Sequence, residues 1–156
     1  LAAALKNYYG VTEPIYFKNA SAGLYNGIED IEKGLADIFN KVIAAKGTIY
    51  QINTLGGKIN EVKKSDSAYP HRDINYLSEL QAYWDSPNQE EKLTKSFDEI
   101  QQIIRNLGNT KQYRNYPDLN FPDANLSYFG DNLARLQQLK KKYDPQNIFD
   151  YPQVIK

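Results

Sequence analysis

The sequence predicts an α+β fold, in which an antiparallel sheet carries helices on one of its faces. Two segments, 28–47 and 90–107, repeat their apolar residues at the spacing of amphipathic helices. Short segments in which β-favouring and polar residues alternate lie between these two. The first two predicted strands are close neighbours in sequence, which suits antiparallel pairing better than the long crossovers of a parallel sheet.

The first predicted helix covers residues 28–47. Its apolar side chains fall on one face, namely Ile28, Ile31, Leu35, Ile38, Phe39 and Val42. Gly47 is well placed to end this helix, because glycine readily adopts the left-handed backbone of a C-terminal cap.

Two short strands are predicted directly after this helix. Residues 48–54, TIYQINT, alternate as a half-buried strand does. The pair Gly56-Gly57 interrupts the pattern, and KINEV, residues 58–62, is predicted to form the second strand. A glycine pair between strands usually marks a turn or bulge, and it also lets the backbone approach a ligand closely.

Residues 73–84 form the next predicted strand. A period of two places one set of side chains on one face, Asn75, Leu77, Glu79, Gln81 and Tyr83. The other face then holds Tyr76, Ser78, Leu80 and Ala82. If the first face is solvated, its polar residues need no special role. If it lines a cavity, Glu79 and Gln81 project two hydrogen-bonding groups into it from a rigid strand.

The second predicted helix runs over residues 90–107 and ends before Gly108. Its inward side chains are Leu93, Phe97, Ile100, Ile104 and Leu107. Residues 113–125 are too rich in proline, asparagine and aspartate for a regular element. A last helix is predicted after Asp131, which would cap it, with apolar positions at Leu133, Leu136 and Leu139. Asp144-Pro145 would end it, because proline cannot continue a helix.

Composition excludes several classes of function. Nineteen basic and nineteen acidic side chains cancel, so neither a nucleic acid nor an anionic membrane is expected as a partner. Cysteine is absent and His71 is the sole histidine, which excludes disulfides, thiolate chemistry and paired-histidine metal sites. No apolar run is as long as a membrane span, so no membrane partner is expected.

The start of the chain and two sequons lead to expectations about its origin. The chain begins LAAALKNYYG, without an initiator methionine or the basic region of a signal peptide. We therefore expect a processed piece or fragment of a longer protein. The triplets Asn19-Ala20-Ser21 and Asn125-Leu126-Ser127 match the N-glycosylation pattern and favour a secreted protein.

Several stretches occur in an order that is not common. The last part of the chain contains YRNYPDLN at 113–120, YFGDN at 128–132 and KKKYDPQNIFDYPQVIK at 140–156. Earlier stretches are YFKNAS at 16–21, GGKINEVKKSDSAYPHR at 56–72 and QAYW at 81–84. Together, and in this order, they resemble the berberine-bridge-enzyme-like family of FAD-linked oxidases.

The resemblance implies a cofactor and a domain organisation. Members of this family are two-domain flavoproteins, in which an antiparallel sheet of the substrate domain roofs the FAD ring. Residues 1–110 would be part of the substrate-binding domain, and residues 111–156 would be the C-terminal segment that returns to the FAD-binding domain. Most of the FAD-binding portion would be absent here. That N-terminal portion is the expected partner, and a separate chain could supply it.

The resemblance also assigns roles to residues. Tyr113 and Asn115 match the Y-x-N pattern that contacts the flavin, and in sugar-oxidising relatives the tyrosine is thought to act as general base. Glu79 matches an active-site strand position and is a second catalytic candidate. The candidate substrate-binding residues are Gln51, Asn53, Gln81 and Tyr76. Sugar oxidases often have an acid where this chain has Asn53, which leaves that helper role open.

The predicted function is therefore oxidation of a small-molecule alcohol, with a mono- or oligosaccharide favoured, by hydride transfer to FAD. The tyrosine would assist proton removal, and O2 is the expected electron acceptor. Three alternatives stay open at this point: a family member that oxidises an alkaloid-like compound with Glu79 as base, a tyrosine-rich module that binds sugar without catalysis, and a degenerate relative kept for assembly. The thirteen tyrosines suit sugar-binding surfaces and ordinary sheet packing alike.

Overall fold

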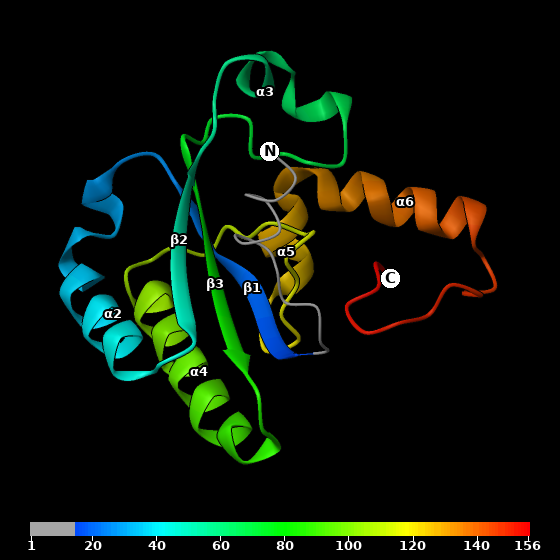
Figure 1. The fold of residues 1–156 in the computed structure, drawn as a ribbon. Coiled ribbons are helices and arrows are strands. Elements are labelled where there is room, and N and C mark those ends of the chain that lie inside the picture. Colours follow the sequence, from blue (N-terminus) through cyan, green and yellow to red (C-terminus); the bar gives the residue numbers. More distant parts are fainter. Residues whose placement is uncertain (1–14) are drawn as a thin grey trace, which may run out of the picture.

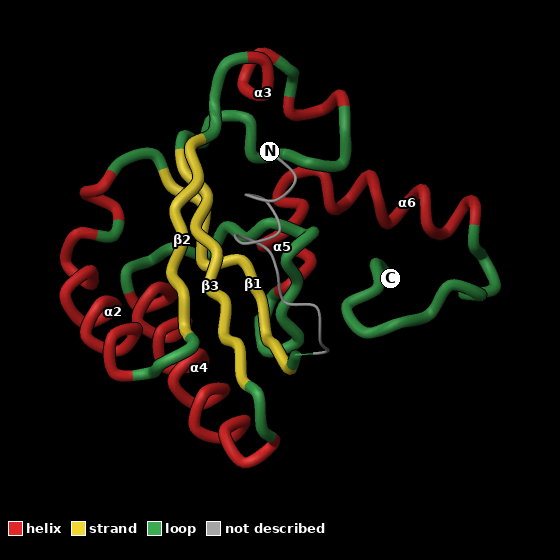
Figure 2. Tube along the Cα trace, in the orientation of Figure 1, coloured by secondary structure: helices red, strands yellow, loops and turns green. Residues whose placement is uncertain are grey.

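Three strands form a single antiparallel sheet, as predicted. The computed structural model describes residues 15–156. The strands are β1 (Tyr16–Tyr25), β2 (Thr48–Thr54) and β3 (Tyr76–Trp84), and β3 lies between the other two (Figure 2). Both pairs are antiparallel. Together with the helices, this arrangement confirms the α+β class.

Two helices cover one face of the sheet (Figure 1). They are α2 (Glu32–Ala44) and α4 (Glu90–Asn106), and α4 begins after a short 3-10 turn, η3 (Pro87–Gln89). The main core fills the space between these helices and the sheet and consists of Ala20, Ala22, Ile38, Ala45, Leu80, Ala82, Trp84, Leu93, Phe97, Ile100 and Ile104. The apolar repeat of 90–107 is thus explained by burial against the strands.

The first helix is shorter than its apolar repeat predicts. Ile28 lies in a 3-10 turn, η1 (Ile28–Asp30), ahead of α2, and its side chain is exposed, like that of Phe39. The helix ends at Ala44, so Gly47 is not its cap. Gly47 has φ +97°, and a Cβ there would lie 2.3 Å from the carbonyl oxygen of Tyr83. Glycine is needed there because the chain passes so close to β3.

KINEV does not form a strand, so that prediction was wrong. Lys58–Glu61 form one helical turn, α3, which is followed by the 3-10 turn η2 (Lys64–Asp66). The Lys58 and Glu61 side chains form an ion pair of 2.6 Å along this turn. The backbone at Gly57, with φ +57°, directs the chain away from the sheet before any second strand can pair.

The sheet also departs from prediction at two strands. β3 begins at Tyr76 rather than at residue 73. β1 had no predicted element, although it occupies one edge of the sheet and supplies two fully buried alanines to the core. Its small side chains and polar residues give a weak local strand signal, and only pairing with β3 makes it a strand.

The C-terminal part forms a smaller cluster beyond β1. Its elements are α5 (Ala124–Phe129), the 3-10 turn η4 (Gly130–Asn132) and α6 (Leu133–Tyr143). Their apolar side chains pack together in a set that comprises Phe121, Ala124, Tyr128, Phe129, Leu133, Leu136 and Ile155. None of the helices within residues 15–156 is both long enough and apolar enough to cross a membrane.

The two ends of α6 differ in how well they match prediction. Asp131 does not cap the helix, because it lies inside η4 and Asn132 precedes the first helical residue. The Asn132 amide instead donates to the Lys64 carbonyl at 2.7 Å. The predicted end is confirmed. Asp144 follows the helix and accepts hydrogen bonds from the amides of Ile148 and Phe149, at 2.7 and 3.1 Å.

Candidate active site

Residues 113–120, which contain the YRNY motif and are called the YRNY segment below, lie along the outer edge of β1. The register of β1 shifts between Ser21 and Leu24, which marks a bulge. At this bulge the amide of Ser21 donates to the carbonyl of Tyr116 at 2.9 Å, and the amide of Leu24 donates to that of Lys111 at 3.2 Å. The YRNY segment therefore covers part of an edge that would otherwise be unpaired.

Ser21 connects this segment to the strand and to the helix layer. Its hydroxyl oxygen accepts a hydrogen bond from the amide of Tyr113 at 3.0 Å. Its carbonyl accepts one from the side chain of Gln101, on α4, at 2.8 Å. Both Ser21 and Gln101 are buried, so these bonds are shielded from water. The backbone of Tyr113 is therefore fixed to a buried point of the sheet.

Gly23, in the bulge, makes the close approach of this segment possible. Its φ is +103°, and a Cβ at this position would lie 2.6 Å from the amide nitrogen of Asn109. The Gly23 amide donates to the side chain of Gln112 at 3.2 Å, in a buried bond. A larger residue would push the segment away from β1 and would strain the backbone.

A cleft of about 640 Å³ opens on the face of the sheet that α2 and α4 leave uncovered. Its walls come from β2, β3, the loop that follows α3, the YRNY segment and α5. The residues that line it are Gln51, Asn53, Leu55, Ile59, Ala68, Tyr69, Arg72, Leu77, Tyr113, Arg114, Asn115, Tyr116, Tyr128 and Phe129. Among the described residues no cluster of histidine and acidic side chains could hold a metal ion.

Four of the predicted site residues meet in this cleft. The Asn115 amide donates to the phenolic oxygen of Tyr113 at 2.8 Å. Across the cleft lining, the Gln51 amide donates to the side-chain oxygen of Asn53 at 2.8 Å. Sequence positions at least 60 residues apart thus contribute two hydrogen-bonded pairs to one surface.

Glu79 and Gln81 lie on the same face of the sheet as Gln51 but outside the cleft lining. Glu79 is 5% exposed and accepts a hydrogen bond from the Asn19 amide. Gln81 accepts one from the hydroxyl of Tyr83 at 2.9 Å. The two residues therefore share one face of β3, as predicted. The Glu79 carboxylate is hydrogen-bonded to Asn19 of β1 and does not line the cleft.

Tyr76 is not brought to the cleft. It belongs to the face of β3 that the helices cover, and its ring stacks on that of Tyr25 with centroids 5.5 Å apart. The alternation along a strand separates Tyr76 from Glu79, because residues an odd number apart point to opposite faces. Its selection as a substrate-binding residue conflicts with this placement.

Two aromatics that pack directly on Tyr113 were missed by the sequence reasoning, as were Tyr128 and Phe129 of the cleft lining. The Tyr69 ring meets the Tyr113 ring edge-on at 5.8 Å, and the Tyr116 ring meets Tyr113 from another side at 5.2 Å. Burial raises the pKa of both added tyrosines, and the nearby Glu79 raises that of Tyr116 further. The signal that could have found Tyr69 and Tyr116 is their place within the motifs YPHR and YRNY.

His71 and Arg72, at the end of the stretch 56–72, have structural contacts. The imidazole Nε2 of His71 lies 3.1 Å from the carbonyl oxygen of Ser127. Arg72 donates to the Ile59 carbonyl at 3.1 Å and lies over the Tyr69 ring at 4.8 Å. Burial lowers the pKa of His71, so the ring is neutral near pH 7.

The chemistry of the cleft fits a flavin ring. Leucine, phenylalanine and tyrosine side chains offer flat apolar contact, and three amide side chains offer donors and acceptors to a polar ring edge. Two arginines line the cleft, and no carboxylate is among the lining residues described. A positive site of this kind favours a ring that gains negative charge on reduction.

Comparison with known proteins agrees with this geometry. Residues 112–156, which include the YRNY segment, α5 and α6, match the family model described as "Berberine and berberine like". An FAD-linked oxidoreductase of Bacillus subtilis is 35% identical over 100 residues, which cover 64% of this chain and 22% of the relative. A protein of Microdochium nivale named carbohydrate oxidase is 33% identical over 129 residues, or 77% of this chain and 26% of the relative.

Solved structures show the same fold. Wild-type BBE-like 1 of Physcomitrella patens aligns with 93% of this chain and with 32% of its own length, at a TM-score of 0.81 and 27% identity. The fold, the cleft and the matched sequence together define one class of protein, the FAD-linked flavoproteins. By sequence and by fold, the chain is a member of the berberine-bridge-enzyme-like family. It spans about a quarter of the length of the curated relatives.

Proposed function

We propose that this chain is the C-terminal portion of an FAD-dependent oxidase that oxidises an alcohol group, with a mono- or oligosaccharide favoured as substrate. The single observation that supports this proposal most is the cleft in which Tyr113 and Asn115 meet Gln51 and Asn53. Amide side chains beside aromatic rings suit a sugar, whose hydroxyls need donors and acceptors and whose CH faces stack on rings. The relative named carbohydrate oxidase is consistent with this substrate class.

In this proposal Tyr113 removes the proton from the substrate hydroxyl. Its phenolic oxygen lies in the cleft and already accepts a hydrogen bond from Asn115. This bond holds the phenolic oxygen in one position, which a group that takes a proton from the substrate requires. Asn115 thus orients Tyr113.

Glu79 is the weaker candidate for this role. It is buried, its side chain accepts from Asn19, and it is absent from the described lining of the cleft. These contacts favour Tyr113 over the alternative in which Glu79 is the base for an alkaloid-like substrate. In the proposal Glu79 instead acts on a tyrosine of the cleft, because its carboxylate adds to burial in raising the pKa of Tyr116.

FAD, when bound, would accept the hydride that leaves the substrate carbon. Tyr113 and Asn115 would contact its ring, and O2 would be the final electron acceptor. The N-terminal FAD-binding portion is the proposed partner, together with the small-molecule substrate. The boundary after residue 110, between the substrate-binding domain and the C-terminal segment, stays a prediction. Secretion of the protein also stays a prediction. The amides of Asn19 and Asn125, in the two sequons, already donate hydrogen bonds within the chain.

The test uses the complete protein, purified and examined for flavin absorbance. A yellow preparation with a flavin spectrum is expected, and a colourless protein that binds no added FAD would contradict the proposal. Oxygen consumption is then measured with a panel of sugars and amines.

Substitution of the two candidate bases separates the mechanisms. We expect Tyr113→Phe to lower kcat at least about a hundredfold, because the proton acceptor is removed, while Glu79→Gln has a smaller effect. Tyr143→Phe is the matched control, since that ring is 72% exposed outside the cleft. The reverse order of losses at Tyr113 and Glu79 would assign the base to Glu79 instead.

A further inference from the structure

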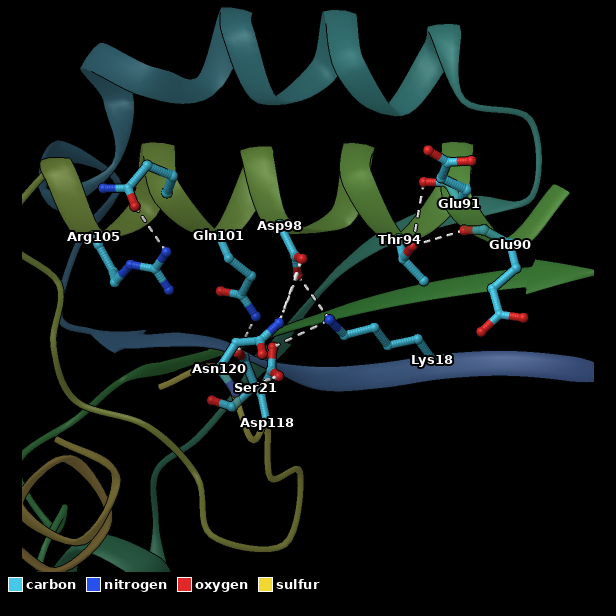
Figure 3. A network of polar contacts seen from close by, with 11 residues as sticks. Lys18, Ser21, Glu90, Glu91, Thr94, Asp98, Gln101, Arg105, Asp118 and Asn120 are labelled. Carbon is cyan, nitrogen blue, oxygen red and sulfur yellow. Dashed lines mark hydrogen bonds and ion pairs between the residues drawn. The ribbon is translucent and has the colours of Figure 1, made fainter. Parts of the chain in front are cut away.

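A lysine on β1 reaches across the edge of the sheet to two carboxylates from different parts of the chain. The Nζ of Lys18 lies 2.8 Å from Oδ1 of Asp98, on α4 (Figure 3). The same Nζ lies 4.6 Å from the centre of the Phe97 ring. It also lies 3.8 Å from Oδ2 of Asp118, two residues beyond the YRNY motif. Figure 3 shows Lys18 between these two acidic groups.

Asp118 is the more deeply buried of the two acids. Its side chain is 4% exposed, whereas that of Asp98 is 47% exposed. One carboxylate oxygen accepts from the amide of Asn120 at 3.0 Å. The other, Oδ2, is buried and has no hydrogen-bond donor among residues 15–156, so Lys18 is the cation that compensates its charge. An isolated buried carboxylate would be strongly unfavourable.

The backbone around Asp118 is fixed as well. Its amide donates to the hydroxyl of Tyr128 at 3.2 Å, and its carbonyl accepts from Gln153 at 2.6 Å. The Asn120 side chain reaches Asp98 at 3.3 Å, which joins the same network. The end of the YRNY segment therefore contacts α4, α5 and the irregular C-terminal segment that contains Gln153.

We propose that Lys18 and Asp118 are positioning residues for the Tyr113–Asn115 pair. The inference rests on the proposed function, since it concerns how the catalytic tyrosine of that function is held. Ser21 holds the amide of Tyr113, and Lys18, three residues earlier on the same strand, holds the side chain of Asp118. β1 therefore contacts the YRNY segment near both of its ends, at Tyr113 and at Asp118, and holds the residues between these two against the sheet.

The placement of Lys18 separates this role from general support of the fold. Residues 16–21 of β1 are each paired with β3, and Lys18 is not a member of the core cluster, although its Nζ lies over the Phe97 ring of that cluster. Loss of the lysine charge therefore leaves the sheet paired. Loss of the lysine removes the positive charge that compensates the buried Asp118 carboxylate. The ion pair that joins β1 to the YRNY segment is lost with it.

The experiment compares Lys18→Met with Lys18→Arg in the complete flavoprotein. Lys41→Met is the matched control, because Lys41 also pairs with an acid of α4, Glu99, at 2.6 Å, on the side away from the cleft. Hydrogen exchange of the peptide 113–120 is the first readout, and it requires no turnover. Steady-state kcat and KM for the preferred sugar are the second.

For Lys18→Met we expect exchange in this peptide to quicken about tenfold relative to the unaltered protein. We also expect kcat to fall about tenfold with KM changed less than about twofold, because the base is displaced while the binding surface remains. Lys18→Arg should restore both values, since a guanidinium can also pair with a carboxylate. Lys41→Met should change neither.

Equal exchange and equal kcat in Lys18→Met and Lys41→Met would overturn the inference, and so would failure of Lys18→Arg to restore them. If Lys18→Met does not fold, Asp118→Asn keeps the shape of the acid without its charge and should quicken exchange in the same peptide. Absence of flavin would refute the proposed function alone, because the exchange comparison would still decide whether Lys18 holds the segment.

Discussion

The two faces of the sheet are built from alternating residues of the same three strands, yet they differ in what covers them. On the helix-covered face, Ala20, Leu80 and Ala82 are fully buried. On the opposite face, Phe17 is 63% and Ile49 is 47% exposed. One face is therefore completed by packing within this chain, while the other presents rings and amides to whatever the cleft binds.

This difference explains where the site lies. A face that packs against helices has side chains in fixed rotamers with no room for a ligand. The open face keeps room, and the YRNY segment covers only its end near Leu77 and Leu24, where Tyr113 and Tyr116 pack on them. The cleft forms at the boundary between the covered and uncovered parts of this face.

The largest expected effect comes from the helix-covered face. Phe97→Ala should lower the free energy of unfolding by about 3–5 kcal/mol, because it empties a fully buried site between α4 and the sheet. Urea unfolding of the complete protein measures this loss. Phe17→Ala on the open face is the matched change and should cost clearly less.

Either outcome sharpens the comparison of the two faces. A loss below about 1 kcal/mol at Phe97 would contradict a tightly packed core between helices and sheet. An equal loss at Phe17 would mean that another part of the complete protein covers the open face as tightly as the helices cover the other.

A smaller effect is expected at the bulge that joins the two regions. Gly23→Ala should destabilise the protein by about 1–3 kcal/mol, because it forces a side chain to a positive φ and onto Asn109. Gly108→Ala serves as control, since Gly108 has φ +85° but no neighbouring atom within 4 Å of a new Cβ. Thermal unfolding should therefore show a greater loss for Gly23. Equal losses would show that the positive φ causes the whole destabilisation and that the contact of the new side chain with Asn109 is relieved at little cost.

The smallest effect concerns three hydroxyls on the helix-covered face. The Tyr25 and Tyr50 hydroxyls each lie 2.9 Å from that of Ser78, and burial raises the pKa of both tyrosines above the ordinary value near 10. The unfolded chain ionises first, so their contribution to stability is complete below about pH 10 and is lost as pH rises further.

Tyr50→Phe tests this pH dependence. It should cost about 1 kcal/mol near pH 7, because one hydrogen-bonding hydroxyl is lost, yet it should reduce the decline of stability above pH 10. Urea unfolding at several pH values checks both parts. A parallel decline for the variant and the unaltered protein would show that Tyr50 ionises as easily in the folded state as in the unfolded one.

Prediction from sequence succeeded where local pattern decides structure. The repeat over 90–107 gave α4 almost to its ends, and the alternation over 48–54 gave β2. The same reasoning failed for KINEV, because its alternation fits a strand as well as a turn, and the glycine pair before it decides where the chain goes. It also missed β1, whose strand character comes from pairing with β3.

The site was predicted in part for a similar reason. Motif resemblance selected Tyr113, Asn115, Gln51 and Asn53, and all four line the cleft. It also selected Tyr76, which strand alternation places on the other face. No local signal in the sequence tells which face of a strand the helices will cover when both faces hold polar and apolar residues.

By itself, the sequence determined the α+β class, the main helices, the family resemblance and the motif tyrosine, because each is written in short-range order of residues. The tertiary structure alone decided that Glu79 is buried against β1, that Tyr69 and Tyr116 enclose Tyr113, and that Lys18 lies between Asp98 and Asp118. Those contacts join residues far apart in the chain, and they exist only once the sheet has formed and the YRNY segment has docked on its edge.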